Sequence, residues 1–191
     1  QPYSAITIWD VELAKFAHQV SQWRAEYAEA LRPEIEQTCQ LFLPELEINV
    51  SFHQGWEKNA DYYEILQQNF ERDRALNYTF AGPQKADFRF KAQGLPVEDV
   101  LSRGQLKLLM CALRLAQGEH LMKEKQRHCI FLIDDFASEL DQYKRALLAK
   151  RLQQSGSQVF VTAITKRQLK EMQVENKKMF SVHNGIINAL N

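Results

Sequence analysis

An apolar run that ends in two acidic residues constrains the fold of this chain more than any other segment. Ile130 to Ile133 contains only large apolar residues, and Asp134 and Asp135 follow directly. Such a run is typical of a strand that is buried on both faces of a parallel sheet. The segment 129–141 therefore predicts a strand that delivers carboxylates to the edge of a sheet, where α/β proteins bind ligands.

The rest of the second half alternates between strand and helix patterns, which favours an α/β layer with parallel strands. We expect a long helix that Ser102 caps, followed by further elements in a regular order. These are a strand at 130–133, a helix at 142–154, a strand at 158–163, a short helix at 166–173 and a hairpin at 180–187 around Asn184-Gly185.

The first part of the chain is predicted to be mainly helical. Asp10 can cap a helix whose apolar residues recur every three or four positions as far as Leu31. Pro33 is expected to end or bend this helix before a second one at 34–43. The remaining predictions are a strand at 47–52, a helix at 61–74 and short strands at 78–81 and 87–91. A change of pattern near residue 76 predicts two domains, 1–76 and 77–191.

Composition narrows the class of protein only slightly. The 191 residues suffice for one domain, or for one domain with a smaller appendage. The formal net charge is zero, so contact with nucleic acid would depend on a local basic surface. Three widely spaced cysteines in apolar contexts suit reduced core thiols of a cytoplasmic protein. The five histidines show no metal-ligand spacing.

The adjacent carboxylates Asp134 and Asp135 can carry chemistry. Neighbouring side chains on a strand point to opposite faces, so one carboxylate can organise Mg²⁺ while the other orients or deprotonates a water. The alternative is a strand end with two solvated acids. Ser138-Glu139-Leu140-Asp141 follows, and Asp141 is well placed to cap the next helix.

The polar turn Ser102-Arg103-Gly104-Gln105 opens the long helix. A serine at the N-cap needs no function, but Gly104 weakens the first turn unless something approaches its backbone closely. Phosphate is the natural candidate, because free N–H groups and the helix dipole favour anions there.

Together these segments resemble motifs of the ABC-type ATPases. Residues 102–105 resemble the signature motif, 130–135 the Walker B strand and 138–141 the D-loop. The runs LSRGQLKLLMCALRLAQG (101–118) and FLIDDFASELD (131–141) are similar to the RecF family of the SMC-like branch. Residues 82–87 resemble that family's Gly-Pro-His-basic-x-Asp segment, with Gln84 in place of histidine. The resemblance covers essentially the whole chain and aligns it with the C-terminal half of RecF.

The resemblance implies an α/β fold, namely the C-terminal part of an ABC-type ATPase head (77–191), plus a mainly helical arm domain (1–76). It assigns Asp134 to the Mg²⁺-associated Walker B position and Asp135 to the water-polarising catalytic position. The signature residues would contact the γ-phosphate of ATP held by the opposite subunit; these are Ser102, Arg103, Gly104 and Gln105. Ser138 and Asp141 become D-loop residues, with Asp141 at the dimer interface.

Two departures from the ATPase pattern stand out. Ala163-Ile164-Thr165 occupies the place of a switch histidine, so hydrolysis should be slow. None of the seven glycines is followed by lysine, so a P-loop is absent. The chain, which begins with Gln1, is therefore expected to be a fragment without Walker A that has little ATP affinity and no turnover alone.

The implied function is slow, DNA-dependent ATP hydrolysis in cytoplasmic recombinational repair and the SOS response. An ATP-dependent homodimer would mark single-strand gaps and junctions, where RecR and RecO help to load RecA. Six basic residues could face DNA or could simply be solvated: Lys58, Arg72, Arg74, Lys85, Arg89 and Lys91. The competing readings are a non-catalytic α/β interaction domain and another SMC-like ATPase head.

Overall fold

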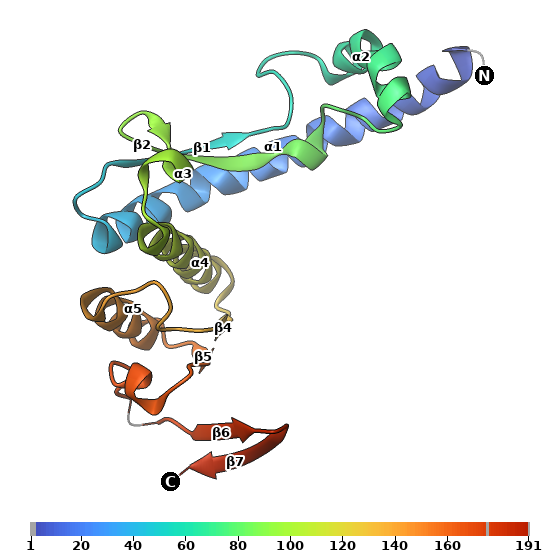
Figure 1. Ribbon diagram of the computed structural model, residues 1–191. Coiled ribbons are helices and arrows are strands. Elements are labelled where there is room, and N and C mark those ends of the chain that lie inside the picture. The colour runs from blue at the N-terminus through green and yellow to red at the C-terminus, as the bar shows by residue number, and fades with distance from the viewer. Residues whose placement is uncertain (1–2, 175, 191) are drawn as a thin grey trace. The chain divides into compact units, whose positions relative to one another are not determined.

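The computed structural model describes residues 3–174 and 176–190, and it forms two compact units (Figure 1). The first unit comprises residues 1–120 and the second residues 121–191. The expected domain boundary at residue 76 falls inside the first unit, where strands pair across it. The division into domains 1–76 and 77–191 stays a prediction. No helix among the described residues is long and apolar enough to cross a membrane.

The first unit is built on one helix, α1 (Tyr3–Phe42), which continues through Pro33. The sequence predicted two helices here, and that prediction is wrong. Leu31 and Ile35 are fully buried on either side of the proline, so packing holds both segments in one helical register. Pro33 itself is exposed, and as a proline it donates no hydrogen bond to the carbonyl four residues earlier.

A second apolar stripe of α1, here called the α1 seam, is exposed except at Val20, which is half-buried. It recurs at alternating spacings of four and three residues, and it consists of Trp9, Leu13, Phe16, Val20, Trp23 and Tyr27. The side chains of Trp9 and Trp23 are 75% and 58% exposed, respectively. These two tryptophans therefore lie outside the core of the first unit, to which Trp56 belongs.

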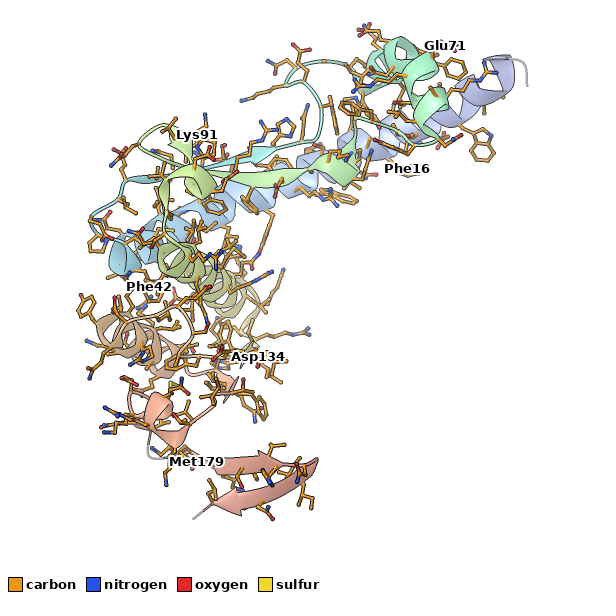
Figure 2. All side chains as sticks on the ribbon, in the orientation of Figure 1. Phe16, Phe42, Glu71, Lys91, Asp134 and Met179 are labelled. Atoms are coloured by element: carbon orange, nitrogen blue, oxygen red, sulfur yellow. The ribbon has the colours of Figure 1, made fainter. Side chains whose placement is uncertain are left out.

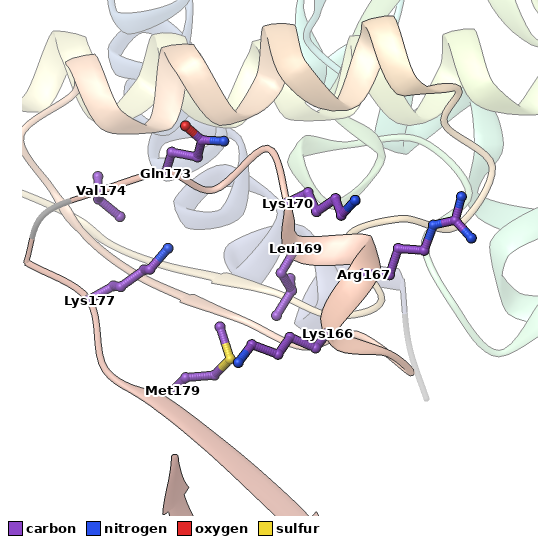
Figure 3. Close-up of a pocket in the computed structure, with 8 residues that line it drawn as sticks. All are labelled: Lys166, Arg167, Leu169, Lys170, Gln173, Val174, Lys177 and Met179. Carbon is purple, nitrogen blue, oxygen red and sulfur yellow. The ribbon is translucent and has the colours of Figure 1, made fainter. Parts of the chain in front are cut away.

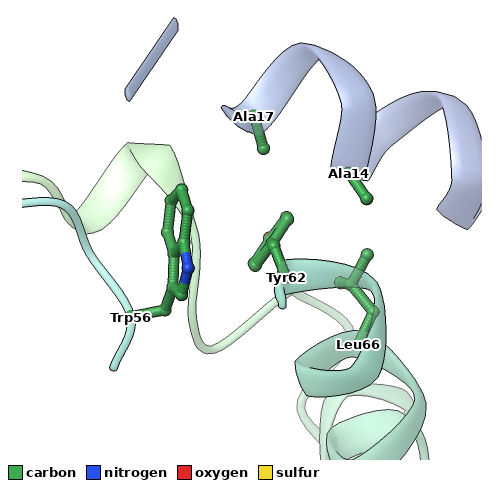
Figure 4. Close-up of a cluster of buried hydrophobic side chains, with 5 residues drawn as sticks. All are labelled: Ala14, Ala17, Trp56, Tyr62 and Leu66. Carbon is green, nitrogen blue, oxygen red and sulfur yellow. The ribbon is translucent and has the colours of Figure 1, made fainter. Parts of the chain in front are cut away.

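Helix α2 (Tyr62–Leu76) packs on α1 around a small aromatic core. Asp61 caps α2 as predicted, because its carboxylate accepts bonds from the N–H groups of Tyr63 and Glu64. The ring centroids of Trp56 and Tyr62 lie 4.7 Å apart, and Ala14, Ala17 and Leu66 belong to the same cluster (Figure 4). This cluster joins the two helices.

An antiparallel sheet completes the first unit. Its strands are β1 (Ile48–His53), β2 (Asp87–Ala92) and β3 (Leu95–Pro96), in that order, with a short helix α3 (Val97–Val100) after them. The predicted strand at 78–81 does not form. The N–H of Phe80 donates to Asp73 (3.0 Å), and the carbonyl of Ala81 accepts from the Tyr62 hydroxyl (2.8 Å). Backbone groups that a strand would pair are bonded to side chains instead.

The second unit contains the predicted parallel pair. Helix α4 (Arg103–Lys125) leads toward β4 (Ile130–Ile133), which pairs in parallel with β5 (Gln158–Val161). Between these strands the chain forms α5 (Gln142–Gln154), the expected crossover helix. The predicted helix at 166–173 is reduced to the 3₁₀ turn η2 (Lys166–Leu169). The predicted hairpin forms from β6 (Met179–His183) and β7 (Ile186–Leu190).

One face of the β4–β5 pair carries exposed apolar side chains. Leu132 is 77% exposed and stands opposite Phe160, which is also exposed. Ile130 lies on the same face as Leu132 and is exposed as well. Two-sided burial of this strand, which its composition predicted, is therefore not achieved by the described residues.

Candidate functional site

The two carboxylates of the candidate site follow directly after β4. Asp134 is exposed at the carboxyl end of the strand (Figure 2), beside the carboxyl end of β5. This is the edge at which α/β sheets bind ligands. The sequence-based placement of the pair at a strand end is therefore reproduced in the structure.

Thr162, the residue after β5, is bonded to both members of the pair. Its hydroxyl donates to a carboxylate oxygen of Asp134 and accepts the N–H of Asp135 at 2.9 Å. Backbone bonds support the arrangement: Thr162 N–H donates to Ile133 O, and Phe136 N–H donates to Thr162 O, each at 3.0 Å. Thr162 was not predicted from the sequence, because its contact with Asp134 spans 28 residues and has no local signal.

Asp135 adopts a left-handed backbone conformation with φ of +47°. This region is sparsely populated by residues other than glycine, although aspartate tolerates it better than most. The strand ends at Ile133, so the alternation of faces invoked from the sequence does not describe Asp135. Strained backbone of this kind is concentrated at functional sites.

The segment 138–141, predicted to be a D-loop, is anchored by burial and by a helix cap. Phe136, Ala137 and Leu140 are buried, which leaves the intervening polar residues near the surface. Asp141 caps α5 as predicted, accepting the N–H of Lys144 at 2.8 Å. Its carboxylate thus has a structural role whatever else it contacts.

The turn from Ser102 to Gln105 forms a reciprocal capping box at the start of α4. Ser102 N–H donates to the side-chain oxygen of Gln105 (2.9 Å), and Gln105 N–H donates to the Ser102 hydroxyl (3.3 Å). The Gln105 amide also donates to Glu45 at 3.2 Å. Ser102 and Arg103 remain exposed. The spacing Ser-x-x-Gln is typical of a capping box. The sequence-based prediction included the Ser102 cap but not the reciprocal bond from Gln105.

The turn and the carboxylate pair belong to different units, 1–120 and 121–191 respectively. All six basic residues proposed for DNA contact lie in the first unit and are exposed. Arg89 and Lys91 alternate with half-buried phenylalanines on β2 and so share one face. The guanidinium of Arg72 stacks over the Phe80 ring, 3.4 Å from its centroid.

A basic hollow in the second unit was not predicted. It has a volume of about 750 Å³, and its lining combines four cations with apolar side chains (Figure 3). The lining residues are Lys166, Arg167, Leu169, Lys170, Gln173, Val174, Lys177 and Met179. The close spacing of basic residues in 166–177 is the sequence feature that could have predicted this hollow.

Among the described residues, no three histidine, cysteine, aspartate or glutamate side chains form a metal-binding group. Mg²⁺ is usually held by one or two carboxylates together with substrate phosphates, not by a cage of protein ligands. The carboxylate oxygens of Asp134 therefore fit a Mg²⁺ ion that arrives with a nucleotide.

Comparison with known proteins identifies the family. The family model described as the RecF/RecN/SMC N terminal domain matches residues 16–188. The chain belongs to the RecF/RecN/SMC family. The DNA replication and repair protein RecF of Haemophilus influenzae (strain 86-028NP) is 97% identical over 191 residues, which are 100% of this chain and 53% of that protein. RecF of Pasteurella multocida (strain Pm70) is 77% identical over 188 residues, 98% of this chain and 52% of that protein.

The chain spans about half the length of these curated RecF relatives. The resemblance predicted the C-terminal half of RecF, whereas the matched family model is described as an N terminal domain. The comparisons therefore support the family and the length of the match, and they do not support the assignment to the C-terminal half.

The fold agrees with a solved structure described as the recombination mediator protein RecF-ATP in the RecFOR pathway. The TM-score is 0.77 at 21% identity, over 100% of this chain and 52% of that one. A second structure, described as RecF-ATPrS, gives a TM-score of 0.75. The predicted fold class, an α/β part of an ABC-type ATPase head with a helical arm, is confirmed.

Proposed function

We propose that this chain supplies the signature turn and the Walker B strand of a RecF ATPase head, and that the P-loop lies in the other half of the protein. The observation that carries the proposal is the pair Asp134-Asp135, fixed at the carboxyl end of β4 by Thr162. No glycine of this chain precedes a lysine, so the phosphate cradle must come from elsewhere. This half alone should bind ATP weakly and should not hydrolyse it.

In the full-length protein, Asp134 would hold Mg²⁺ with the nucleotide and Asp135 would orient the attacking water. Mg²⁺, when bound, neutralises charge on the phosphates. The chain's own part is to hold two carboxylates at fixed positions, one beyond the strand end in a left-handed conformation. Slow hydrolysis is expected, because Ala163-Ile164-Thr165 provides no imidazole next to the site.

ATP would act by joining two subunits. Each nucleotide would lie between the P-loop and Walker B residues of one subunit and the Ser102–Gln105 turn of the other. The capping box supports this role, because it fixes the first turn of α4 while Ser102 and Arg103 stay exposed. Such a contact is two-fold symmetric, and Asp141 and Ser138 of the D-loop would lie at the same interface.

The dimer would bind DNA at single-strand gaps and junctions and, with RecR and RecO, help to load RecA in the bacterial cytoplasm. The names of the relatives, a DNA replication and repair protein and a recombination mediator protein, support this assignment. Arg89 and Lys91 are the candidates for DNA contact that share one face of a strand.

The deciding experiment is the substitution Ser102→Arg in the full-length RecF protein. A long cation in the exposed turn should block the second subunit and leave nucleotide binding by the monomer nearly unchanged. Light scattering with and without Mg-ATP measures the mass, and a fluorescent ATP analogue measures binding. Ser51→Arg is the matched control, because Ser51 is exposed on β1 of the same unit.

Normal dimerisation of the Ser102→Arg protein would show that the turn does not act across subunits. If the wild-type protein did not dimerise in the presence of any nucleotide, the alternative of a non-catalytic α/β interaction domain would be favoured instead. A coiled-coil SMC-like head is the weaker alternative, because the curated relatives in this identity range are RecF proteins.

A further inference from the structure

Thr162 follows β5 and contacts the residues that follow β4. Neither the sequence motifs nor the steps of the proposed ATPase mechanism give its side chain a role. We propose that Thr162 is a positioning residue, which sets the Asp134 carboxylate and the Asp135 backbone in the geometry that nucleotide and Mg²⁺ require. The effect on Mg²⁺ and nucleotide rests on the proposed function. The hydrogen bonds of Thr162 themselves are present in the structure without nucleotide.

The first argument is chemical. The Thr162 hydroxyl donates a hydrogen bond to a carboxylate oxygen of Asp134 and at the same time accepts one from the N–H of Asp135 at 2.9 Å. A hydroxyl is both donor and acceptor, so one atom can serve both neighbours. Valine, which has nearly the same shape, can do neither.

The second argument separates the side chain from the backbone. Thr162 N–H bonds to Ile133 O and its carbonyl accepts from Phe136 N–H, both at 3.0 Å. These bonds extend the β4–β5 pairing and do not depend on the side chain. Loss of the hydroxyl should therefore leave the strands paired and change only the two acidic residues.

The third argument is conformational. Asp135 has a φ of +47°, in a left-handed region that residues with a side chain populate only sparsely. The bond from its N–H to Thr162 constrains the backbone there. Without that bond, the backbone at Asp135 should sample other conformations, and its carboxylate should no longer be fixed.

The position of Thr162 gives this contact a further meaning. It precedes Ala163-Ile164-Thr165, the segment in which related ATPases place a switch histidine. Thr162 is thus a link by which a displacement at the end of β5 would reach the carboxylates after β4.

The test uses full-length RecF with Thr162→Val and Thr162→Ser. Hydrogen–deuterium exchange of the Asp135 amide, measured without nucleotide, should be faster in the valine variant and near wild type in the serine variant. The Mg²⁺ concentration for half-maximal ATP hydrolysis should rise about 10–100-fold in the valine variant, as for other lost partners of metal ligands. Thr79→Val, in the first unit, is the matched control.

Wild-type exchange at Asp135 together with a wild-type Mg²⁺ requirement in Thr162→Val would overturn the proposal. Should that variant fail to fold, Thr162→Ala provides the same measurements with a smaller side chain. Absence of ATP-dependent dimers in the wild-type protein would instead count against the proposed function, and the exchange experiment would still decide the role of Thr162.

Discussion

The backbone N–H of Gly82 donates a hydrogen bond of 3.1 Å to the carbonyl oxygen of Gly55. Both glycines have positive φ, +103° for Gly55 and +142° for Gly82. A Cβ on Gly55 would collide with the Gly82 backbone, and one on Gly82 would collide with the Tyr62 ring. This close approach ties the loop after β1 to the loop before β2, so the same Gly-Pro segment that resembles a family motif also has a packing role.

Gly82→Ala should therefore lower the free energy of unfolding by about 2–4 kcal/mol, because strain at positive φ adds to overpacking. Urea denaturation monitored by circular dichroism measures the loss. Gly94→Ala is the control: its φ is +82°, but a Cβ there meets no atom within 4 Å. Equal losses at Gly82 and Gly94 would mean that the close contact contributes nothing.

Tyr62 should make stability fall at alkaline pH. Burial, together with the negative charges of Asp73 and Asp10, raises its pKa to about 12. The neutral phenol is thus favoured in the folded state, and its contribution is complete below the unfolded pKa near 10 and is lost as pH rises toward 12. Unfolding measured from about pH 9 to about pH 11 should show this fall.

Tyr62→Phe should flatten that pH dependence, since phenylalanine does not ionise. At neutral pH the same variant should lose about 1 kcal/mol, because the bond to the Ala81 carbonyl is removed. An unchanged alkaline slope in the phenylalanine variant would assign the fall to other groups.

Asp135→Asn in the full-length protein should keep ATP-dependent dimers and slow hydrolysis by on the order of a hundredfold, because an amide cannot take a proton from water. Dimer mass and phosphate release in the same sample test both halves of this statement. Asp141→Asn offers a comparison, since an asparagine still caps α5. Hydrolysis at the wild-type rate would remove Asp135 from the catalytic role.

Neutralising Arg89 and Lys91 together, both to glutamine, should weaken DNA binding and make it less sensitive to salt. If both contact phosphates, the slope of log affinity against log salt should decrease by about 1.8. The double variant Lys166→Gln, Lys170→Gln in the basic hollow removes the same charge from the second unit. An equal effect of the two double variants would indicate general attraction and not a contact on β2.

The parts of the fold that follow from local patterns were predictable. The strand at 130–133, its parallel partner, the crossover helix and the Asn184-Gly185 hairpin depend on apolar runs, caps and turn residues that lie close together in sequence. The position of Asp134 and Asp135 after the strand and the Asp141 cap were predictable for the same reason.

Tertiary contacts decided what the sequence could not predict. Buried neighbours carry α1 through Pro33, and the Tyr62 hydroxyl and the Asp73 carboxylate take backbone bonds from the expected strand at 78–81. The left-handed Asp135 depends on Thr162, far along the chain. None of these contacts has a periodic signal in the sequence.

The α1 seam also allows its burial to be followed by intrinsic tryptophan fluorescence. Trp9 and Trp23 are largely exposed to water, whereas Trp56 is only 4% exposed. Indole emission shifts to shorter wavelength and resists quenching when the ring leaves water. Any segment that covers the α1 seam, whether from the rest of a longer polypeptide or from a second subunit, should therefore shift the emission of Trp9 and Trp23 to shorter wavelength. The emission of Trp56 should stay constant.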